Sequence, residues 1–205
     1  MEDAHNLTSS LYRQQSEQNA MAWMKFLADK HPATYRHCVR VAIMAEKLAN
    51  CLAMNEDDKG KLVIGCFLHD VGKGLLPIEL WNQKEALSRE QWQTVRLHST
   101  VGSDLMQANS ALGPEILDVI RHHHENWDGT GYPDGLAGEE IPYLARVCAV
   151  VAAFDSMLTE YPYVKMGSLE EAKQELVRSS GTQFDSRIVQ AFLKLPNAML
   201  DIYMH

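Results

Sequence analysis

Residues 62–70 read LVIGCFLHD, an apolar run that ends in the doublet His69-Asp70. The run is apolar nearly all round at helical spacing, which is typical of a helix in the centre of a domain. A buried imidazole and a buried carboxylate are unfavourable unless they are paired or bind a metal ion. The doublet therefore indicates a polar centre inside the core, although by itself it is also compatible with a simple hydrogen-bonded pair.

Helical spacing of apolar residues continues on both sides of this run. Further helices are expected at about residues 35–52 and after the capping or turn residues Asn55, Ser88, Pro114, Pro142, Ser168 and Asp185. On the helix after Ser88, Trp92 and Val95 are expected to mark the buried side. No alternating pattern predicts a strand, so the sequence predicts an all-α bundle.

The amino-terminal part differs from the rest of the chain. A helix-like segment covers about residues 7–29, but residues 13–19 are polar on all sides. Pro32 then interrupts the helical pattern. We expect residues 1–31 to be an N-terminal helical segment, either a linker or an appendage, and residues 32–205 to form the main domain.

Other histidines share the inward faces of the expected helices. They are His37, His98, His123 and His124. His37 precedes Val41 by four residues, and His98 follows Val95 by three, so each shares a face with an apolar residue. Five histidines and one aspartate on core faces are difficult to explain as separate hydrogen-bonded groups. They match the nitrogen and oxygen ligands that a metal centre needs.

The number of donors predicts two metal ions. Six donors exceed what one four-coordinate ion takes from a protein, and Asp70 is the natural bridging carboxylate. Two ions about 3.5–4 Å apart can activate water and hold a phosphate ester. Imidazole and carboxylate ligands without thiolate allow Fe, Mn, Ni, Co or Zn. Lys73 is expected to neutralise a phosphate oxygen or to support Asp70, and its alternative is a solvated lysine at a helix end.

Composition narrows the classes of function. The chain has 205 residues and a formal net charge of −8, which argues against DNA or membrane binding through a basic surface. No apolar run is long enough to span a bilayer, and no signal-peptide pattern begins the chain. The four cysteines form no CxxC pair and are expected to be small core residues; they are Cys38, Cys51, Cys66 and Cys148. These features predict a reducing, cytoplasmic setting.

Taken together, the motifs resemble an HD-GYP domain, a subfamily of the HD metal-dependent phosphohydrolases. The matching pieces are HCVRV at 37–41, LHDVGK at 68–73, His98 with Gly102, HHENWDGTGYP at 123–133, IP at 141–142 and ARV at 145–147. The resemblance implies an all-helical HD-domain bundle that hydrolyses the bacterial second messenger cyclic di-GMP to pGpG or GMP at a centre of two or three metal ions.

The resemblance also assigns roles to individual residues. The ligands would be His37, His69, Asp70, His98, His123 and His124. Asp70 and Lys73 would act in catalysis, with Lys73 at the scissile phosphate. Gly131, Tyr132 and Pro133 would form the loop beside the substrate, where the ring of Tyr132 could stack on guanine or could equally just hold the loop in place.

Several positions depart from the family pattern. Ala33 stands where members with a third metal carry glutamate, so two ions and pGpG as the product are expected. Ala152 replaces the first aspartate of an Asp-x-x-Asp pair, and only Asp155 remains. Asp155 is expected to bind a metal directly or through water, or else to hold another side chain. The Arg-Pro-Tyr-Arg segment reads YPYV at 161–164, and Lys165 is the remaining candidate cation for the substrate.

Three functions are therefore compatible with the sequence. The first is an active cyclic di-GMP phosphodiesterase. The second is a degenerate domain that binds a metal or nucleotide and acts through a signalling partner protein or an upstream sensor domain, as the losses at Ala152, Tyr161 and Val164 allow. The third is an HD phosphohydrolase for another phosphate ester.

Overall fold

The computed structural model describes residues 18, 21–83, 85–108, 112–159 and 167–200. Residues 21–30 are helical. The elements that follow are α2 (Pro32–Cys51), α3 (Glu56–Leu68), η1 (Val71–Leu75), α4 (Glu79–Asn82), α5 (Arg89–Gln107), α6 (Pro114–His122), η2 (Gly138–Glu140), α7 (Tyr143–Met157), α8 (Leu169–Arg178), α9 (Ser186–Leu193) and α10 (Asn197–Leu200). Within these ranges the only β pairings are isolated bridges, so the predicted all-α class is confirmed.

The predicted caps begin the helices as expected. The Asn55 side chain accepts a hydrogen bond from the backbone N–H of Asp58 at the start of α3. Ser88 and Ser168 each begin a helix with a complete capping box. Asp185 accepts from the backbone N–H of Arg187 at the start of α9. Each cap satisfies an N–H group that has no partner inside its helix.

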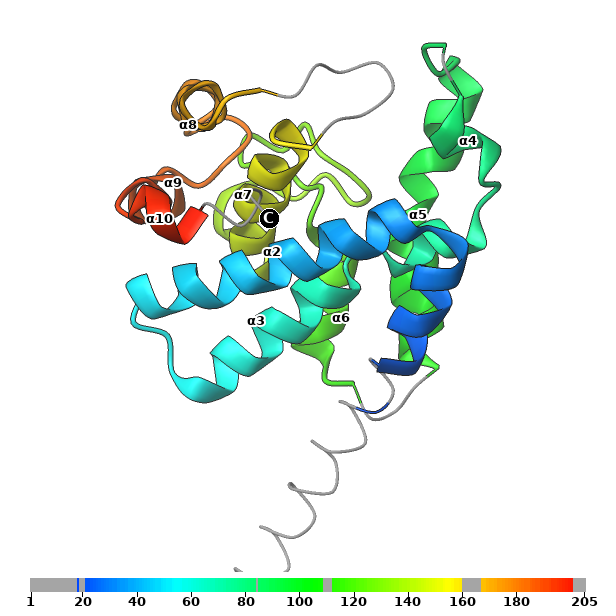
Figure 1. Cartoon of the computed structure of the whole chain (residues 1–205), viewed down its shortest axis with the longest axis horizontal. Helices are drawn as coiled ribbons and strands as arrows, with labels where there is room; N and C mark the ends of the chain where they lie inside the picture. The colour runs from blue at the N-terminus through cyan, green and yellow to red at the C-terminus, as the bar shows by residue number, and fades with distance from the viewer. Residues whose placement is uncertain (1–17, 19–20, 84, 109–111, 160–166, 201–205) are drawn as a thin grey trace, which may run out of the picture.

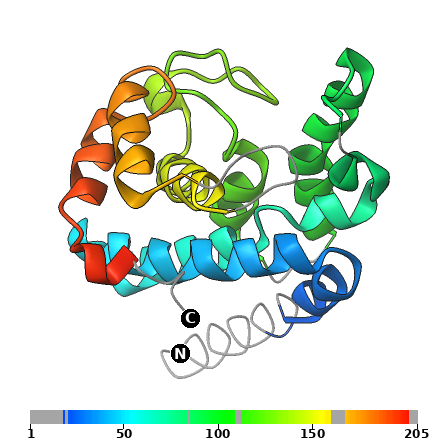
Figure 2. The same cartoon turned by 45° about the horizontal axis from the view of Figure 1, so that its top comes forward.

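Helix α7 lies in the middle of the bundle, where α2, α3, α6, α8 and α9 pack against it. Helix α2 crosses one face of the molecule and packs against α3 and α7, while α6 lies against α3 and α5 (Figure 1). Helices α8, α9 and α10 lie at one end, and α4 and α5 lie at the other. The turned view shows residues 21–30 beside the start of α2 (Figure 2). None of the helices in the described ranges is both long and apolar enough to cross a membrane.

Two apolar clusters form the core. The larger joins α2, α3 and α7 to α8 and α9, and in it the rings of Phe154 and Phe192 lie 4.6 Å apart. The smaller includes Met24, Leu27 and Leu68. Met24 and Leu27 are almost completely buried, which contributes about 1.5–3 kcal/mol per side chain. The predicted boundary between residues 31 and 32 stays a prediction.

Two expectations of burial are wrong. Cys51 is exposed, whereas Cys38, Cys66 and Cys148 are buried. Cys51 is the last residue of α2 and lies on the exposed side of the helix, whereas Leu48 and Leu52 face the core. Trp92 is 50% exposed, because the first turns of α5 project beyond the bundle together with α4 (Figure 1).

Candidate metal centre

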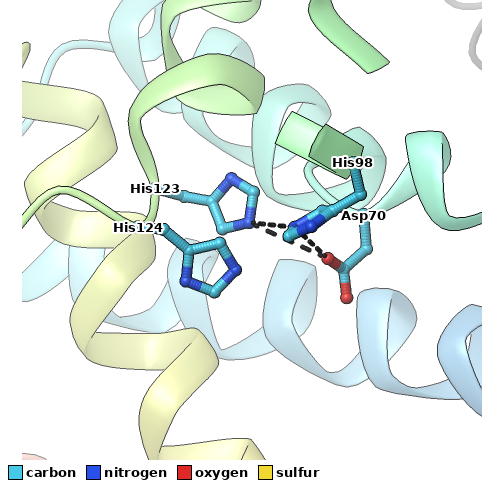
Figure 3. A group of neighbouring side chains, drawn as sticks. All are labelled: Asp70, His98, His123 and His124. Carbon is cyan, nitrogen blue, oxygen red and sulfur yellow. Dashed lines mark hydrogen bonds and ion pairs between the residues drawn. The ribbon is translucent and has the colours of Figure 1, made fainter. Parts of the chain in front are cut away.

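The structure brings the six predicted donors together from four parts of the chain. His37 comes from α2, His69 and Asp70 follow α3, His98 lies on α5, and the last two histidines follow α6. The donor atoms form two groups that share Asp70, and within each group they lie within 4.8 Å of one another. One group is His37, His69 and Asp70; the other is Asp70, His98, His123 and His124, shown in Figure 3.

Asp70 lies between the two groups with one oxygen toward each. Its Oδ1 is 3.3 Å from His98 Nε2 and 3.8 Å from His123 Nε2. Its Oδ2 is 3.5 Å from His69 Nε2 and 3.8 Å from His37 Nε2. This geometry suits a carboxylate that bridges two ions.

A close backbone contact explains how His98 reaches Asp70. A Cβ atom on Gly72 in η1 would overlap the carbonyl group of His98, and one on Gly102 in α5 would lie 3.1 Å from the Gly72 nitrogen. Because neither glycine carries a side chain, η1 and α5 approach each other backbone to backbone. The His98 imidazole is thereby held against the end of α3.

Hydrogen bonds to carbonyl groups fix the tautomer of three histidines. The Nδ1 atoms of His69, His98 and His123 each lie near the carbonyl oxygen of the residue three positions earlier. The acceptors are Cys66, Val95 and Ile120, at 2.7, 2.7 and 2.9 Å. A carbonyl oxygen only accepts, so Nδ1 carries the hydrogen, and in the neutral ring Nε2 presents a lone pair to the centre.

These lone pairs converge without hydrogens between them. The Nε2 atoms of His98 and His123 are 3.3 Å apart, and those of His37 and His69 are 3.2 Å apart. His37 Nδ1 lies 2.7 Å from a carboxylate oxygen of Asp155, which accepts its hydrogen, so His37 too presents the Nε2 lone pair to the centre. Among the described residues, the buried Oδ1 atom of Asp70 has no hydrogen-bond donor. A cluster of buried acceptors that face one another is unfavourable by itself and is what a divalent cation requires. The residues therefore fit a metal centre.

The electrostatics of the centre keep the donors available. Burial lowers the pKa of His69 to about 4 and also holds the pKa values of His123 and His124 well below the ordinary value. Burial alone would raise the pKa of Asp70, but the Lys73 ammonium beside it holds that pKa well below its usual range. Lys73 Nζ lies 2.6 Å from Asp70 Oδ2. At neutral pH the imidazoles of His69, His123 and His124 are therefore neutral and the Asp70 carboxylate is charged.

Asp155 lies behind His37 and outside the two donor groups. Its Oδ2 is 2.7 Å from His37 Nδ1, and Arg40 reaches both of its oxygens at 2.8 Å. Direct or water-mediated metal binding by Asp155 stays a prediction, and the geometry favours the other role left open, that of holding a side chain. Ala152, one turn earlier on α7, lines the pocket of the centre.

A loop stabilised by Glu125 borders the centre. The buried carboxylate of Glu125 accepts hydrogen bonds from three successive backbone N–H groups, those of Asp134, Gly135 and Leu136. A Cβ atom on Gly131 would lie 2.6 Å from the His124 carbonyl oxygen, so the loop closes against the chain only with glycine there. The Tyr132 ring stacks on His124, with centroids 4.7 Å apart and planes at 21°.

Five of the six donors, all except His98, line a pocket of about 360 Å³. Lys73, Gly131 and Tyr132 line it, whereas Pro133 is not among the residues that line it. Contact of these four residues with a substrate stays a prediction. Lys165 lies outside the described residues.

Three charged residues around the centre had no predicted role. Glu125 and Arg40 lie within the motifs that predicted the centre, although no spacing signal assigned them a function. Arg96 lines the pocket two residues before a predicted ligand, and no pattern in the sequence pointed to it.

Known proteins are similar to this chain in sequence. Residues 22–188 match the HD domain family. The chain is 33% identical to a cyclic di-GMP phosphodiesterase of Thermotoga maritima over 83% of this chain and 46% of that protein. It is 32% identical to one of Pseudomonas aeruginosa, over 86% of this chain and 42% of that protein. The chain thus spans less than half the length of these relatives.

A solved structure agrees with the fold. An HDG"Y"P protein from Bdellovibrio bacteriovorus superposes with a TM-score of 0.65 at 23% identity, covering 77% of this chain and 50% of that one. By the family match, which spans all six donors, the chain belongs to the HD domain family and is related to the HD-GYP cyclic di-GMP phosphodiesterases.

Proposed function

We propose that this chain is a metal-dependent phosphodiesterase that hydrolyses cyclic di-GMP, with pGpG rather than GMP as its product. The observation that carries the proposal is the convergence of unprotonated imidazole nitrogens on both oxygens of Asp70, at the base of an open pocket. The activity named for the two relatives supports the choice of substrate.

The donors would hold two divalent transition-metal ions. His37, His69 and Asp70 would hold one, and Asp70 with the three remaining histidines would hold the other. Bound there, the ions would activate water and stabilise the charge that develops on the phosphoryl oxygens. One group offers three protein donors and the other offers four, so we expect the two sites to differ in affinity.

Lys73 supports the proposed chemistry from the pocket wall. Its ammonium lies 2.6 Å from Asp70 and 5.1 Å from the centroid of the Trp81 ring. We propose that it keeps Asp70 ionised and contacts the scissile phosphate. We infer that the reaction stops at pGpG from Ala33, whose side chain offers no donor for a third ion.

A second candidate function rests on Ala152. The missing carboxylate leaves the group of His37, His69 and Asp70 with three donors. If that group binds its ion too weakly for catalysis, the chain would bind nucleotide without turnover and act as a regulator. The third candidate, hydrolysis of another phosphate ester, has no observation that favours it over cyclic di-GMP.

One assay separates these functions. The chain is loaded with Mn²⁺ or Fe²⁺ without oxygen and incubated with cyclic di-GMP, and the nucleotides are separated by chromatography. We expect pGpG to accumulate with wild type and with the control Asp57→Ala, a surface carboxylate on α3, but not with Asp70→Ala. Tight binding without turnover would favour the regulator, and turnover of other phosphate esters alone would favour the third function.

A further inference from the structure

The pocket wall includes the guanidinium of Arg96, which has no role in the proposed metal centre. Arg96 lies on α5, two residues before His98, and lines the same pocket as Asp70 and Lys73. Its side chain is exposed at the rim of the pocket, in contrast to the buried imidazole of His98. Arg96 is therefore placed to meet a molecule that enters the pocket.

The guanidinium of Arg96 packs against the ring of Tyr132. Arg96 Cζ lies 5.0 Å from the centroid of the Tyr132 ring. The Tyr132 ring also stacks on the imidazole of His124 at 4.7 Å and meets the imidazole of His98 edge-on at 6.5 Å. A guanidinium over an aromatic ring is attracted to its face and keeps its N–H groups directed outward. The stack thus connects the pocket rim to the metal centre.

The charge of Arg96 is not neutralised by the part of the chain that the structure describes. Of the two cations that line the pocket, Lys73 is paired with Asp70 at 2.6 Å. The guanidinium of Arg40, behind the centre, is paired with Asp155. For Arg96 the described residues provide the ring of Tyr132 and no carboxylate within ion-pair distance. Its donors remain available for an anion in a chain whose net charge is −8.

We propose that Arg96 binds the phosphate of the substrate that is not being cleaved. This inference rests on the proposed function, because a cyclic dinucleotide carries two phosphodiesters and the metal centre engages only one. The planar fork of a guanidinium matches two phosphate oxygens, and charge-assisted hydrogen bonds of this kind are about twice as strong as neutral ones. Arg96 would thereby provide the cationic contact that Tyr161 and Val164 cannot.

The test compares Arg96→Gln and Arg96→Lys with wild type, using two substrates. For cyclic di-GMP we expect Arg96→Gln to raise KM about tenfold or more with kcat within about twofold, and Arg96→Lys to restore part of the loss. For bis(p-nitrophenyl) phosphate, which has a single phosphate, kcat/KM should not change. Arg89→Gln removes the same charge at the start of α5, away from the pocket, and should leave both substrates unaffected.

Equilibrium binding of cyclic di-GMP to the metal-loaded chain separates the two proposals. If wild type binds without turnover, the proposed function fails, and a Kd that rises about tenfold in Arg96→Gln still supports the role of Arg96. An equal loss of kcat/KM on both substrates, or a changed metal content, would overturn the proposed role of Arg96 in favour of a structural one. A loss seen with cyclic di-GMP but not with cyclic di-AMP would overturn it in favour of contact with the guanine edge. No binding by wild type would overturn both proposals.

Discussion

Asp70 has a different set of neighbours at each of its two oxygens, and this asymmetry sets the properties of the centre. The group on the Oδ1 side has three histidines and the group on the Oδ2 side has two. An ion on the Oδ2 side would therefore take more of its ligands from water or substrate. We call the ion on the Oδ2 side the second ion. Its affinity should respond most strongly to a single substitution.

Ala152→Asp tests this asymmetry. Ala152 lines the pocket one turn before Asp155, whose carboxylate contacts His37. A carboxylate at position 152 would add a fourth donor, so we expect the affinity for the second Mn²⁺ ion to rise at least about tenfold, as measured by calorimetric titration. Ala153→Asp adds the same charge to the pocket on another face of α7 and should have a smaller effect. Equal effects would mean that charge alone, not ligation, changed the affinity.

Glu125→Gln tests the support of the loop. The Glu125 carboxylate accepts hydrogen bonds from three backbone N–H groups. An amide in its place keeps one oxygen and turns an NH₂ group toward the loop. We expect the free energy of unfolding to fall by about 1–3 kcal/mol and nucleotide binding to weaken, with metal content retained. Urea denaturation and nucleotide titration measure these changes. Glu139→Gln, an exposed residue, is the control; a stable Glu125→Gln variant with normal binding would show that the loop does not need this residue.

For individual residues, the sequence pointed to the six donors but not to the charged residues around them. Inward spacing on apolar helices pointed to the six side chains that the structure brings together, because each histidine had to share a face with buried residues. Their binding of metal ions stays a prediction. Arg40, Arg96 and Glu125 make their contacts across large separations in the chain or along an irregular loop. No helical periodicity relates them to their partners, so only the tertiary structure shows what they contact.

Among the elements, the contact of η1 with α5 depends most on a single residue type. A methyl group on Gly72 would overlap the His98 carbonyl group. Gly72→Ala should therefore destabilise the chain by about 1–3 kcal/mol or more and weaken metal binding, because η1 and α5 must separate. Thermal unfolding and metal titration test this.

Gly60→Ala provides the matched control for that contact. Gly60 lies within α3, and among the described residues no close neighbour of an added Cβ is found there. The change should be neutral or stabilise the helix by up to about 1 kcal/mol. If Gly72→Ala behaved in the same way, the close approach of η1 and α5 would not be required for the centre.

Helix ends were more predictable than helix faces. Asn55, Ser88, Ser168 and Asp185 cap as predicted because a cap depends on residues within one turn. The error at Trp92 has a different origin, since the periodicity of α5 is correct but its first turns project past the core. The lengths of the other helices decide which turns of an amphipathic helix are covered by a neighbour.

For the molecule as a whole, the buried histidines predict sensitivity to acid. The pKa of His69 is about 4 in the folded state and about 6.5 in the unfolded state, so between these values the unfolded chain binds more protons. The contribution of His69 is fully present above pH 6.5 and is lost as the pH falls toward 4, by up to about 1.4 kcal/mol per pH unit. The lowered pKa values of His123 and His124 act in the same direction.

Urea denaturation of the metal-free chain between pH 8 and pH 4.5 measures this effect. We expect the free energy of unfolding to decline below pH 6.5 and the decline to be shallower in His69→Gln. A free energy of unfolding that stays constant through this range would show that the histidines are not held neutral by burial.

The number of Mn²⁺ ions bound per chain, measured by calorimetric titration without oxygen, tests the metal centre most directly. Wild type should bind one ion tightly and a second more weakly, and Asp57→Ala should do the same. Asp70→Ala should lose the second ion and bind the first at least about 100-fold more weakly, because both donor groups share that carboxylate. Failure of wild type to bind any ion, or unchanged binding by Asp70→Ala, would contradict a metal centre built on Asp70.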